Sequence, residues 1–284
     1  MYQPESYVIT LVFMILSMLC WGSWANTIKL CPGYRFQLFY WDYVIGLIVA
    51  AVAWGFTLGS LGSSGAPFLR DLASTSNHAM LLAAAGGAVF NVANLLLVAA
   101  IEIAGLAVAF PVGIGIALVV GAISNYILAP KGNPFLLFGG IALVVAAIIF
   151  DALAYSQRET GKSRSTRRGL FISLLSGLLM GSFYPMVSGA MSGKGAAGPY
   201  SAAFFFAIGV AICAVPVNYL LMRFPLDGDY PVALRGYQRA PMRWHLAGVL
   251  GGAIWCTGAL SNFLASRATS LAPLSPIQSA REPR

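Results

Sequence analysis

Two asparagines stand in a long apolar run, where an unpaired polar group would cost at least a few kcal/mol in a bilayer. Asn91 and Asn94 are three positions apart, so they share one face of a helix. Each amide offers two N–H donors and a carbonyl acceptor, which suits a neutral, hydrogen-bonding solute. The same spacing fits an interhelical asparagine clamp, worth about 1 kcal/mol in membrane bundles. The sequence leaves both interpretations open.

Four acidic residues are weighed as proton carriers or helix braces: Asp42, Glu102, Asp151 and, less so, Asp71. Glu102 lies within almost unbroken apolar sequence, where burial would keep a proton on its carboxyl group, as a coupling residue requires. Asp42 is interpreted as a coupling or coordinating carboxylate, or as a brace for the first helix. For Asp151 the favoured interpretation is an interfacial carboxylate paired with a loop base.

Ring side chains and helix breakers are candidates for lining a cavity. Pro111 and Gly113 favour either a broken helix beside the solute or a packing kink. Aromatic residues form walls for a planar solute or anchor the span ends at the membrane interface. The residues concerned are Trp21, Trp24, Tyr40 and Trp255.

Motifs of soluble or membrane-embedded enzymes are absent from the sequence. There is no Walker motif, no HExxH and no GxSxG, and the four cysteines have no metal-ligand spacing. His78 and His245 are interpreted as isolated loop or interface residues. We therefore expect neither an enzyme nor a cofactor or metal site.

The composition predicts which elements hold these residues. The 284 residues are 58% hydrophobic and 9% charged, which is too little charge to cover a soluble domain of this size. A bilayer core about 30 Å thick needs roughly 20 apolar helical residues. Eight stretches qualify and predict an all-α integral membrane protein: 7–28, 38–59, 79–100, 106–128, 134–155, 169–190, 200–222 and 244–265.

Lysine and arginine predict the orientation of the spans, so the net charge of +8 is read as a topology signal. The connections that follow odd-numbered spans carry most of these bases, and the loop 156–168 alone carries five. That side is expected to be cytoplasmic. The prediction is a multi-pass protein of the cell (inner) membrane with its N-terminus outside.

The second half of the sequence repeats features of the first half in the same order. The first unit has five spans, an odd number, so the second copy must insert upside down, as in many secondary transporters with a midplane solute site. Three pairs of segments match at offsets between 159 and 165 residues: Leu16-Ser17 with Leu175-Ser176, Ile45-Gly46 with Ile208-Gly209, and Gly86-Gly87 with Gly251-Gly252.

The repeat divides the chain into four parts. Residues 1–155 form the first five-helix repeat, 156–168 a basic cytoplasmic linker, 169–265 a second repeat with three helices, and 266–284 a polar tail. The tail is too polar to cross a bilayer. We expect a ten-helix design that is cut or frameshifted after helix eight, with a genuine eight-helix protein as the alternative.

Several runs resemble the ureide permease family: Trp21–Asn26, Phe39–Tyr43, Gly86–Asn94, and Asn125-Tyr126 before the Lys131–Asn133 turn. The wider group resembles the glucose/rhamnose porter branch of the drug/metabolite transporter superfamily. The resemblance covers most of 7–155 and, more loosely, 169–272. It implies a ten-helix secondary carrier that moves a small polar solute with protons. The chain departs from this pattern in lacking the last two helices and in its short central loop.

The expected function is secondary active transport by alternating access, with ureides or related nitrogenous heterocycles as solutes and sugars close behind. An efflux permease of the same superfamily and a truncated, non-transporting membrane protein are the alternatives. The expected partners are a small solute, protons and membrane lipids, without nucleic acid, and a homodimer is left open. The proposed solute-binding residues are Asn91, Asn94, Trp24, Tyr40, Pro111 and Gly113, and the coupling residues are Glu102 and Asp42.

Overall fold

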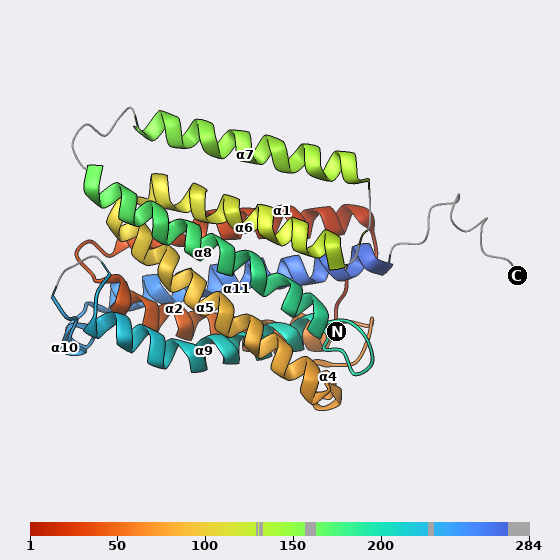
Figure 1. The fold of residues 1–284 in the computed structure, drawn as a ribbon. Coiled ribbons are helices and arrows are strands. Elements are labelled where there is room, and N and C mark those ends of the chain that lie inside the picture. Colours follow the sequence, from red (N-terminus) through yellow and green to blue (C-terminus); the bar gives the residue numbers. More distant parts are fainter. Residues whose placement is uncertain (129, 131–132, 157–162, 227–229, 272–284) are drawn as a thin grey trace, which may run out of the picture.

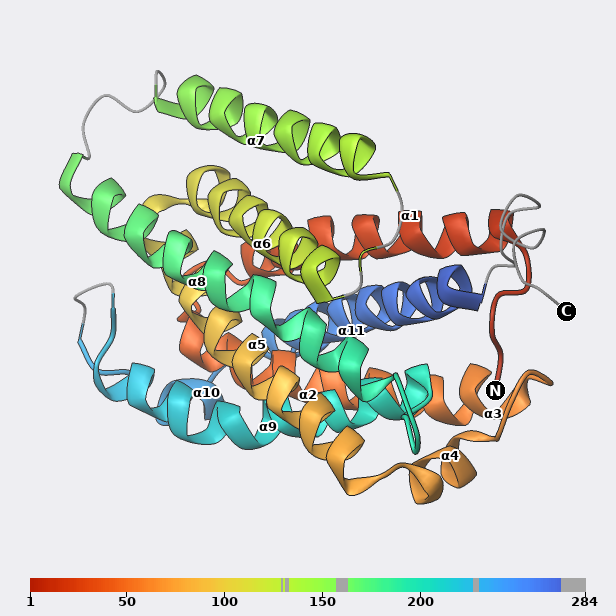
Figure 2. The ribbon, with the colours of Figure 1, turned by 45° about the vertical axis from the view of Figure 1, so that its right-hand side comes forward.

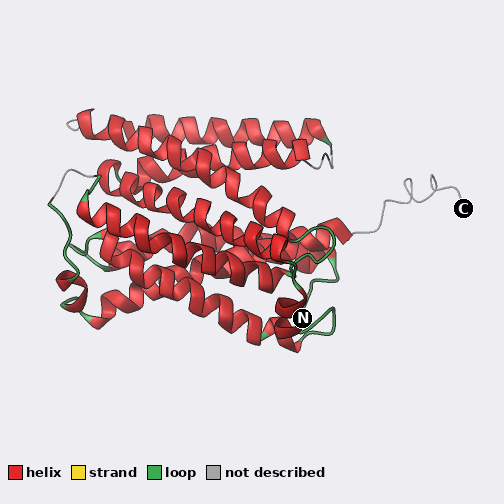
Figure 3. Cartoon of the chain, turned by 60° about the horizontal axis from the view of Figure 1, so that its bottom comes forward, coloured by secondary structure: helices red, strands yellow, loops and turns green. Residues whose placement is uncertain are grey.

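The computed structural model describes the chain except residues 129, 131–132, 157–162, 227–229 and 272–284. Its described part is built from helices and contains no strand (Figures 1 and 3). The elements are α1 Tyr7–Ser23, the 3-10 helix η1 Trp24–Leu30, α2 Phe36–Phe56, α3 Leu58–Leu61, α4 Phe68–Ser74, α5 Asn77–Ala104, α6 Leu106–Leu128, α7 Pro134–Ser156, α8 Ser163–Ala190, α9 Pro199–Arg223, α10 Arg235–Gln238 and α11 Met242–Leu271.

Seven helical segments among the described residues are long and apolar enough to cross a membrane, which confirms the prediction of a helical integral membrane protein. They correspond to predicted spans one to four and six to eight. The predicted fifth span is α7, whose described apolar part runs from Pro134 to Phe150. Helix α8 already begins at Ser163, inside the predicted linker 156–168, and the end of the predicted tail lies outside the described residues.

The long helices lie side by side and pack in a regular pattern (Figures 1 and 2). Helix α5 packs against α8 and α9, while α11 packs against α1 and α2, and α2 packs against α9. Helix α7 lies at the outside of the bundle next to α6. The interior where α2, α5, α9 and α11 meet therefore joins helices from the two halves of the chain.

Short elements distinguish the two ends of the bundle. We call the end with η1, α10 and the starts of α2 and α11 the α10 end, and the end with α3, α4 and the starts of α5 and α9 the α4 end (Figure 1). At the α4 end the Ser76 side chain caps α5 by accepting the Ala79 N–H at 3.2 Å. There Asp71 accepts the Gly198 N–H at 2.8 Å and fixes the loop before α9.

Helix α6 runs through Pro111 without interruption from Leu106 to Leu128. The broken helix, one of two alternatives for this segment, is therefore not observed. Gly113 serves packing: a Cβ atom there would lie 2.7 Å from Cδ1 of Leu97, and one on Gly177 of α8 would lie 2.5 Å from the Gly113 carbonyl oxygen. Small residues let α6 approach α5 and α8 closely.

Candidate functional site

A buried polar cluster joins α2 to α5. The Tyr40 hydroxyl donates to Oδ1 of Asn91 at 3.1 Å and accepts from Nδ2 of Asn94 at 3.4 Å. All three residues are 0% exposed. The structure thus brings together three of the predicted solute-binding residues, which lie 51 and 54 positions apart in the chain.

The chemistry of this cluster leaves one donor and one acceptor unused. A tyrosine hydroxyl has a single proton, so it donates to one amide and accepts from the other. Nδ2 of Asn91 and Oδ1 of Asn94 consequently have no hydrogen-bond partner among the described residues. Exchanging the O and N atoms of both amides would still leave one N–H donor and one carbonyl acceptor available.

Two further aromatic rings lie next to Tyr40 in this interior. The Tyr40 and Tyr43 rings stack at a centroid distance of 5.2 Å, and Trp24 lies 5.0 Å from Tyr43. Trp24 is buried and is not an anchor at the membrane interface. This places a fourth predicted residue, Trp24, beside the Tyr40 cluster.

A second group of rings fills the meeting point of α5, α9 and α11. The Trp255 ring lies 4.0 Å from that of Phe90 and stacks on Phe206 at 5.5 Å with an interplanar angle of 10°. Trp21 stacks on Trp255 at 5.9 Å. The flat surfaces in the interior therefore come from both halves of the chain.

Two further buried amides lie beside the cluster and were missed in the sequence. Asn218 of α9 donates to the Gln37 carbonyl oxygen at 2.8 Å, and both residues are 0% exposed. Neither side-chain amide atom of Gln37, nor Oδ1 of Asn218, has a partner within the described chain. Gln37 precedes Tyr40 by three positions and so shares its face of α2. Asn91 was identified as a lone amide in an apolar span. The same sequence signal identifies Asn218.

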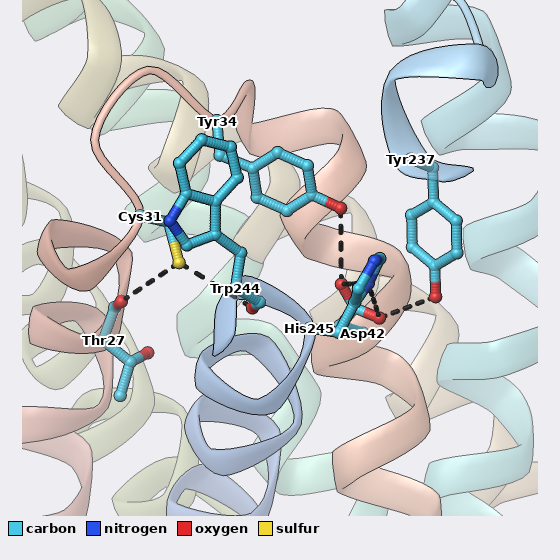
Figure 4. A network of polar contacts seen from close by, with 7 residues as sticks. All are labelled: Thr27, Cys31, Tyr34, Asp42, Tyr237, Trp244 and His245. Atoms are coloured by element: carbon cyan, nitrogen blue, oxygen red, sulfur yellow. Dashed lines mark hydrogen bonds and ion pairs between the residues drawn. The ribbon is translucent and has the colours of Figure 1, made fainter. Parts of the chain in front are cut away.

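Asp42 is the centre of a second network, at the α10 end (Figure 4). Its buried carboxylate lies 2.9 and 3.1 Å from Nδ1 of His245 and accepts the Tyr237 hydroxyl at 2.6 Å. The Tyr34 hydroxyl donates to it at 3.5 Å. Asp42 therefore links α2 to α10 and α11, and the interpretation of His245 as an isolated residue is wrong.

The surroundings of Asp42 keep its tyrosine partners protonated. Burial, the hydrogen bond to Asp42 and the charge of its carboxylate raise the pKa of Tyr237 to about 12. Burial and the same carboxylate raise the pKa of Tyr34 as well. Burial, followed by Asp42, also raises the pKa of the Cys31 thiol, which Arg243 opposes. At neutral pH both hydroxyls therefore remain donors to the carboxylate.

The other predicted residues lie apart from these two groups. The side chain of Glu102 is exposed, so the expectation that it is buried is wrong. Pro111 and Gly113 belong to α6, where Gly113 contacts α5 and α8. The side chain of Asp151 lies outside the described residues.

Comparison with known proteins finds a partial similarity to ureide permeases. The Ureide permease family model matches residues 39–168. The chain is 31% identical to Ureide permease 1 of Arabidopsis thaliana over 158 residues, which cover 55% of this chain and 40% of the relative. Ureide permease 2 of the same plant is 31% identical over 171 residues (58% and 43%), and Probable ureide permease A3 of Vigna unguiculata is 28% identical over 159 residues (54% and 42%).

These matches have a limited extent. The chain spans about two fifths of the length of these curated relatives. No solved structure matches it. The matched stretch includes Tyr40, Asp42, Asn91 and Asn94 but not His245. The described residues thus have the helices of a multi-pass membrane protein, and over residues 39–168 the chain is similar to ureide permeases.

Proposed function

We propose that this protein is a secondary active transporter of ureides and related nitrogenous heterocycles. The observation that carries the proposal is the buried Tyr40–Asn91–Asn94 cluster, with its unused amide N–H and its unused carbonyl oxygen. A ureide presents C=O and N–H groups side by side, so it can satisfy both. Satisfying them removes a penalty of about 1–3 kcal/mol for each buried unpaired group.

Close helix crossings support the inverted arrangement of the two halves. A Cβ atom on Gly46 of α2 would meet the backbone of Val249 in α11, and one on Gly209 of α9 would meet the backbone of Ala84 in α5. Gly209 is the repeat equivalent of Gly46, and residue 249 is that of residue 84. Exchanging the two halves therefore maps one crossing onto the other.

A second pair of crossings obeys the same relation. A Cβ atom on Gly87 would meet the Phe206 carbonyl oxygen, and one on its equivalent Gly252 would meet the Tyr43 carbonyl oxygen. Two halves joined by such equivalent contacts can rock about a shared centre. We infer alternating access around the Tyr40 cluster, which lies in this interior.

Proton coupling is assigned to Asp42 rather than to Glu102. Asp42 is buried and contacts groups from both halves, whereas Glu102 is exposed at the end of α5. The start of α8 lies at the α10 end (Figure 1), together with Arg223, Arg235, Arg239 and Arg243 of the second half. We propose that this end faces the cytoplasm, because short basic loops stay on that side.

Solute binding by the purified protein tests the proposal. We expect calorimetry in lipid nanodiscs to detect allantoin binding, and Asn91→Ala and Asn94→Ala to weaken it about tenfold or more, since each removes a hydrogen-bonding amide. Asn26→Ala, an exposed position in η1, is the matched control and should leave the affinity unchanged. Uracil, glucose and rhamnose complete the panel. Wild-type affinity in both cluster variants, or no binding of any ureide or heterocycle, would refute the proposal.

A further inference from the structure

We propose that Asp42 and His245 form one proton-binding site. Their contact joins α2 of the first half to α11 of the second half at the α10 end. The role of this site in coupling rests on the proposed transport function, whereas the site itself follows from side-chain contacts. His245 lies outside the stretch that is similar to ureide permeases. Its part in the site comes from its position beside Asp42 (Figure 4).

The geometry assigns one ring nitrogen to the carboxylate. Nδ1 of His245 faces both oxygens of Asp42, at 2.9 and 3.1 Å, so Nδ1 carries a proton and donates it. A titrating proton must therefore enter and leave at Nε2. When both nitrogens are protonated the contact is an ion pair, and when Nε2 is deprotonated a hydrogen bond from the neutral ring to the carboxylate remains.

The partial exposure of His245 gives a proton access to this site. The His245 side chain is 19% exposed, whereas that of Asp42 is 3% exposed. The imidazole therefore lies between the carboxylate and the medium at the α10 end. A proton reaching this site arrives on the histidine and alters the interaction with a carboxylate that is shielded from water.

The groups around the pair do not compete for this role. Among the described residues, the titratable groups that face Asp42 besides His245 are Tyr34 and Tyr237, and Cys31 and Arg243 lie next to them. The two tyrosines remain protonated at neutral pH, the thiol pKa is raised, and the guanidinium is always charged. Imidazole is the side chain whose charge ordinarily changes between pH 5 and 8, so protonation of this network falls to His245.

Helices α2 and α11 pack closely at the Asp42–His245 contact, which lies near the solute cluster. A Cβ atom on Gly248 would meet Cβ of Asp42, so α11 passes directly over this carboxylate. Tyr40 and Asp42 are two positions apart in α2, and Gly248 lies one turn from Gly252 at the Tyr43 crossing. Losing the ionic contact would weaken the α2–α11 contact at the end nearest the proposed solute site.

Histidine NMR tests the proton site without any solute. The chain has two histidines, and exposed His78 at the start of α5 is the matched control. In ¹⁵N-histidine-labelled protein in nanodiscs, we expect neutral His245 to carry its proton on Nδ1. Asp42→Asn removes the carboxylate that faces Nδ1, so the ring-nitrogen signals of His245 should change relative to those of the wild type. The His78 signal should not move.

Transport assays test the coupling role. We expect His245→Gln to reduce accumulation driven by a pH gradient at least tenfold more than it reduces solute exchange at equal pH, with His78→Gln resembling the wild type. An unchanged His245 signal in Asp42→Asn would overturn the proton site. A wild-type pH profile of accumulation in His245→Gln would overturn its coupling role. Failure to bind ureides would instead refute the proposed function, and the NMR result would still decide the proton site.

Discussion

At the scale of single residues, environment separates two carboxylates that look alike in sequence. Asp42 and Glu102 both lie in apolar surroundings along the chain, yet Asp42 is buried and contacts three polar side chains, whereas Glu102 is exposed. Two of its partners follow it by 195 and 203 positions. Local sequence therefore identified Asp42 as a candidate, but its network depends on how α10 and α11 pack.

The Tyr40 hydroxyl is expected to organise the two amides of the proposed solute site. Tyr40→Phe leaves Oδ1 of Asn91 and Nδ2 of Asn94 without their shared partner, at a cost of about 1–3 kcal/mol in the free energy of unfolding. Solute affinity should fall about tenfold or more because the amides lose their fixed orientation. Thermal unfolding and calorimetry measure the two effects. Tyr219→Phe, 57% exposed on α9, is the control, and equal behaviour of both variants would contradict the prediction.

The Tyr237 hydroxyl is expected to remain a donor across the physiological range. Its pKa is raised to about 12, so the stability it contributes is present below the ordinary tyrosine pKa of about 10 and is lost as the pH rises through about 12. Tyrosinate absorbance of the wild type minus that of Tyr237→Phe measures this titration. In Asp42→Asn the midpoint should move down toward 10, since the hydrogen bond and the charge are gone. An unshifted midpoint would show that burial alone raises the pKa.

At the scale of elements, glycines determine how closely the helices cross. The repeated pair Ile45-Gly46 and Ile208-Gly209 in the sequence corresponds to two tight crossings, α2 with α11 and α5 with α9. Gly113 was expected near the solute, but it serves packing against α5 and α8. Small residues allow both close packing and cavities, so the sequence alone does not distinguish these roles.

Gly46→Ala and Gly209→Ala are expected to destabilise the protein by similar amounts. Each added methyl group would overlap a backbone carbonyl group of the partner helix, and overpacking of this kind costs about 1–3 kcal/mol. Gly22→Ala is the matched control because nothing lies within 4 Å of its Cβ position. It should be neutral or stabilising by up to about 1 kcal/mol. Thermal unfolding in detergent compares the three, and a tolerated alanine at both crossings would contradict the prediction.

At the scale of the whole molecule, the two ends of the bundle differ in basic charge. The α10 end holds Arg223, Arg235, Arg239 and Arg243, whereas Arg70 and Lys194 lie at the α4 end. Helix α8 starts at the α10 end as well (Figure 1). Charge and fold together predict the orientation given above.

Cysteine labelling tests this orientation. In a background without the four native cysteines, Gln238→Cys at the α10 end should react with an impermeant maleimide only after the cells are permeabilised. Ser192→Cys at the α4 end should react in intact cells. Both positions are exposed, so accessibility within the protein does not limit the reaction. The reverse pattern would place the α10 end outside and invert the proposed topology.

The sequence by itself determined the helical membrane class, the positions of the spans, and Tyr40, Asp42, Asn91 and Asn94 as candidate residues. Span length and lone polar groups in apolar runs are local properties, so they can be read along the chain. Only the tertiary structure decided that Tyr40 joins the two asparagines, that Asn218 contacts Gln37, and that His245 faces Asp42. These contacts connect residues that are 51 to 203 positions apart in the chain. Such pairs form only when the helices pack against one another in the folded protein.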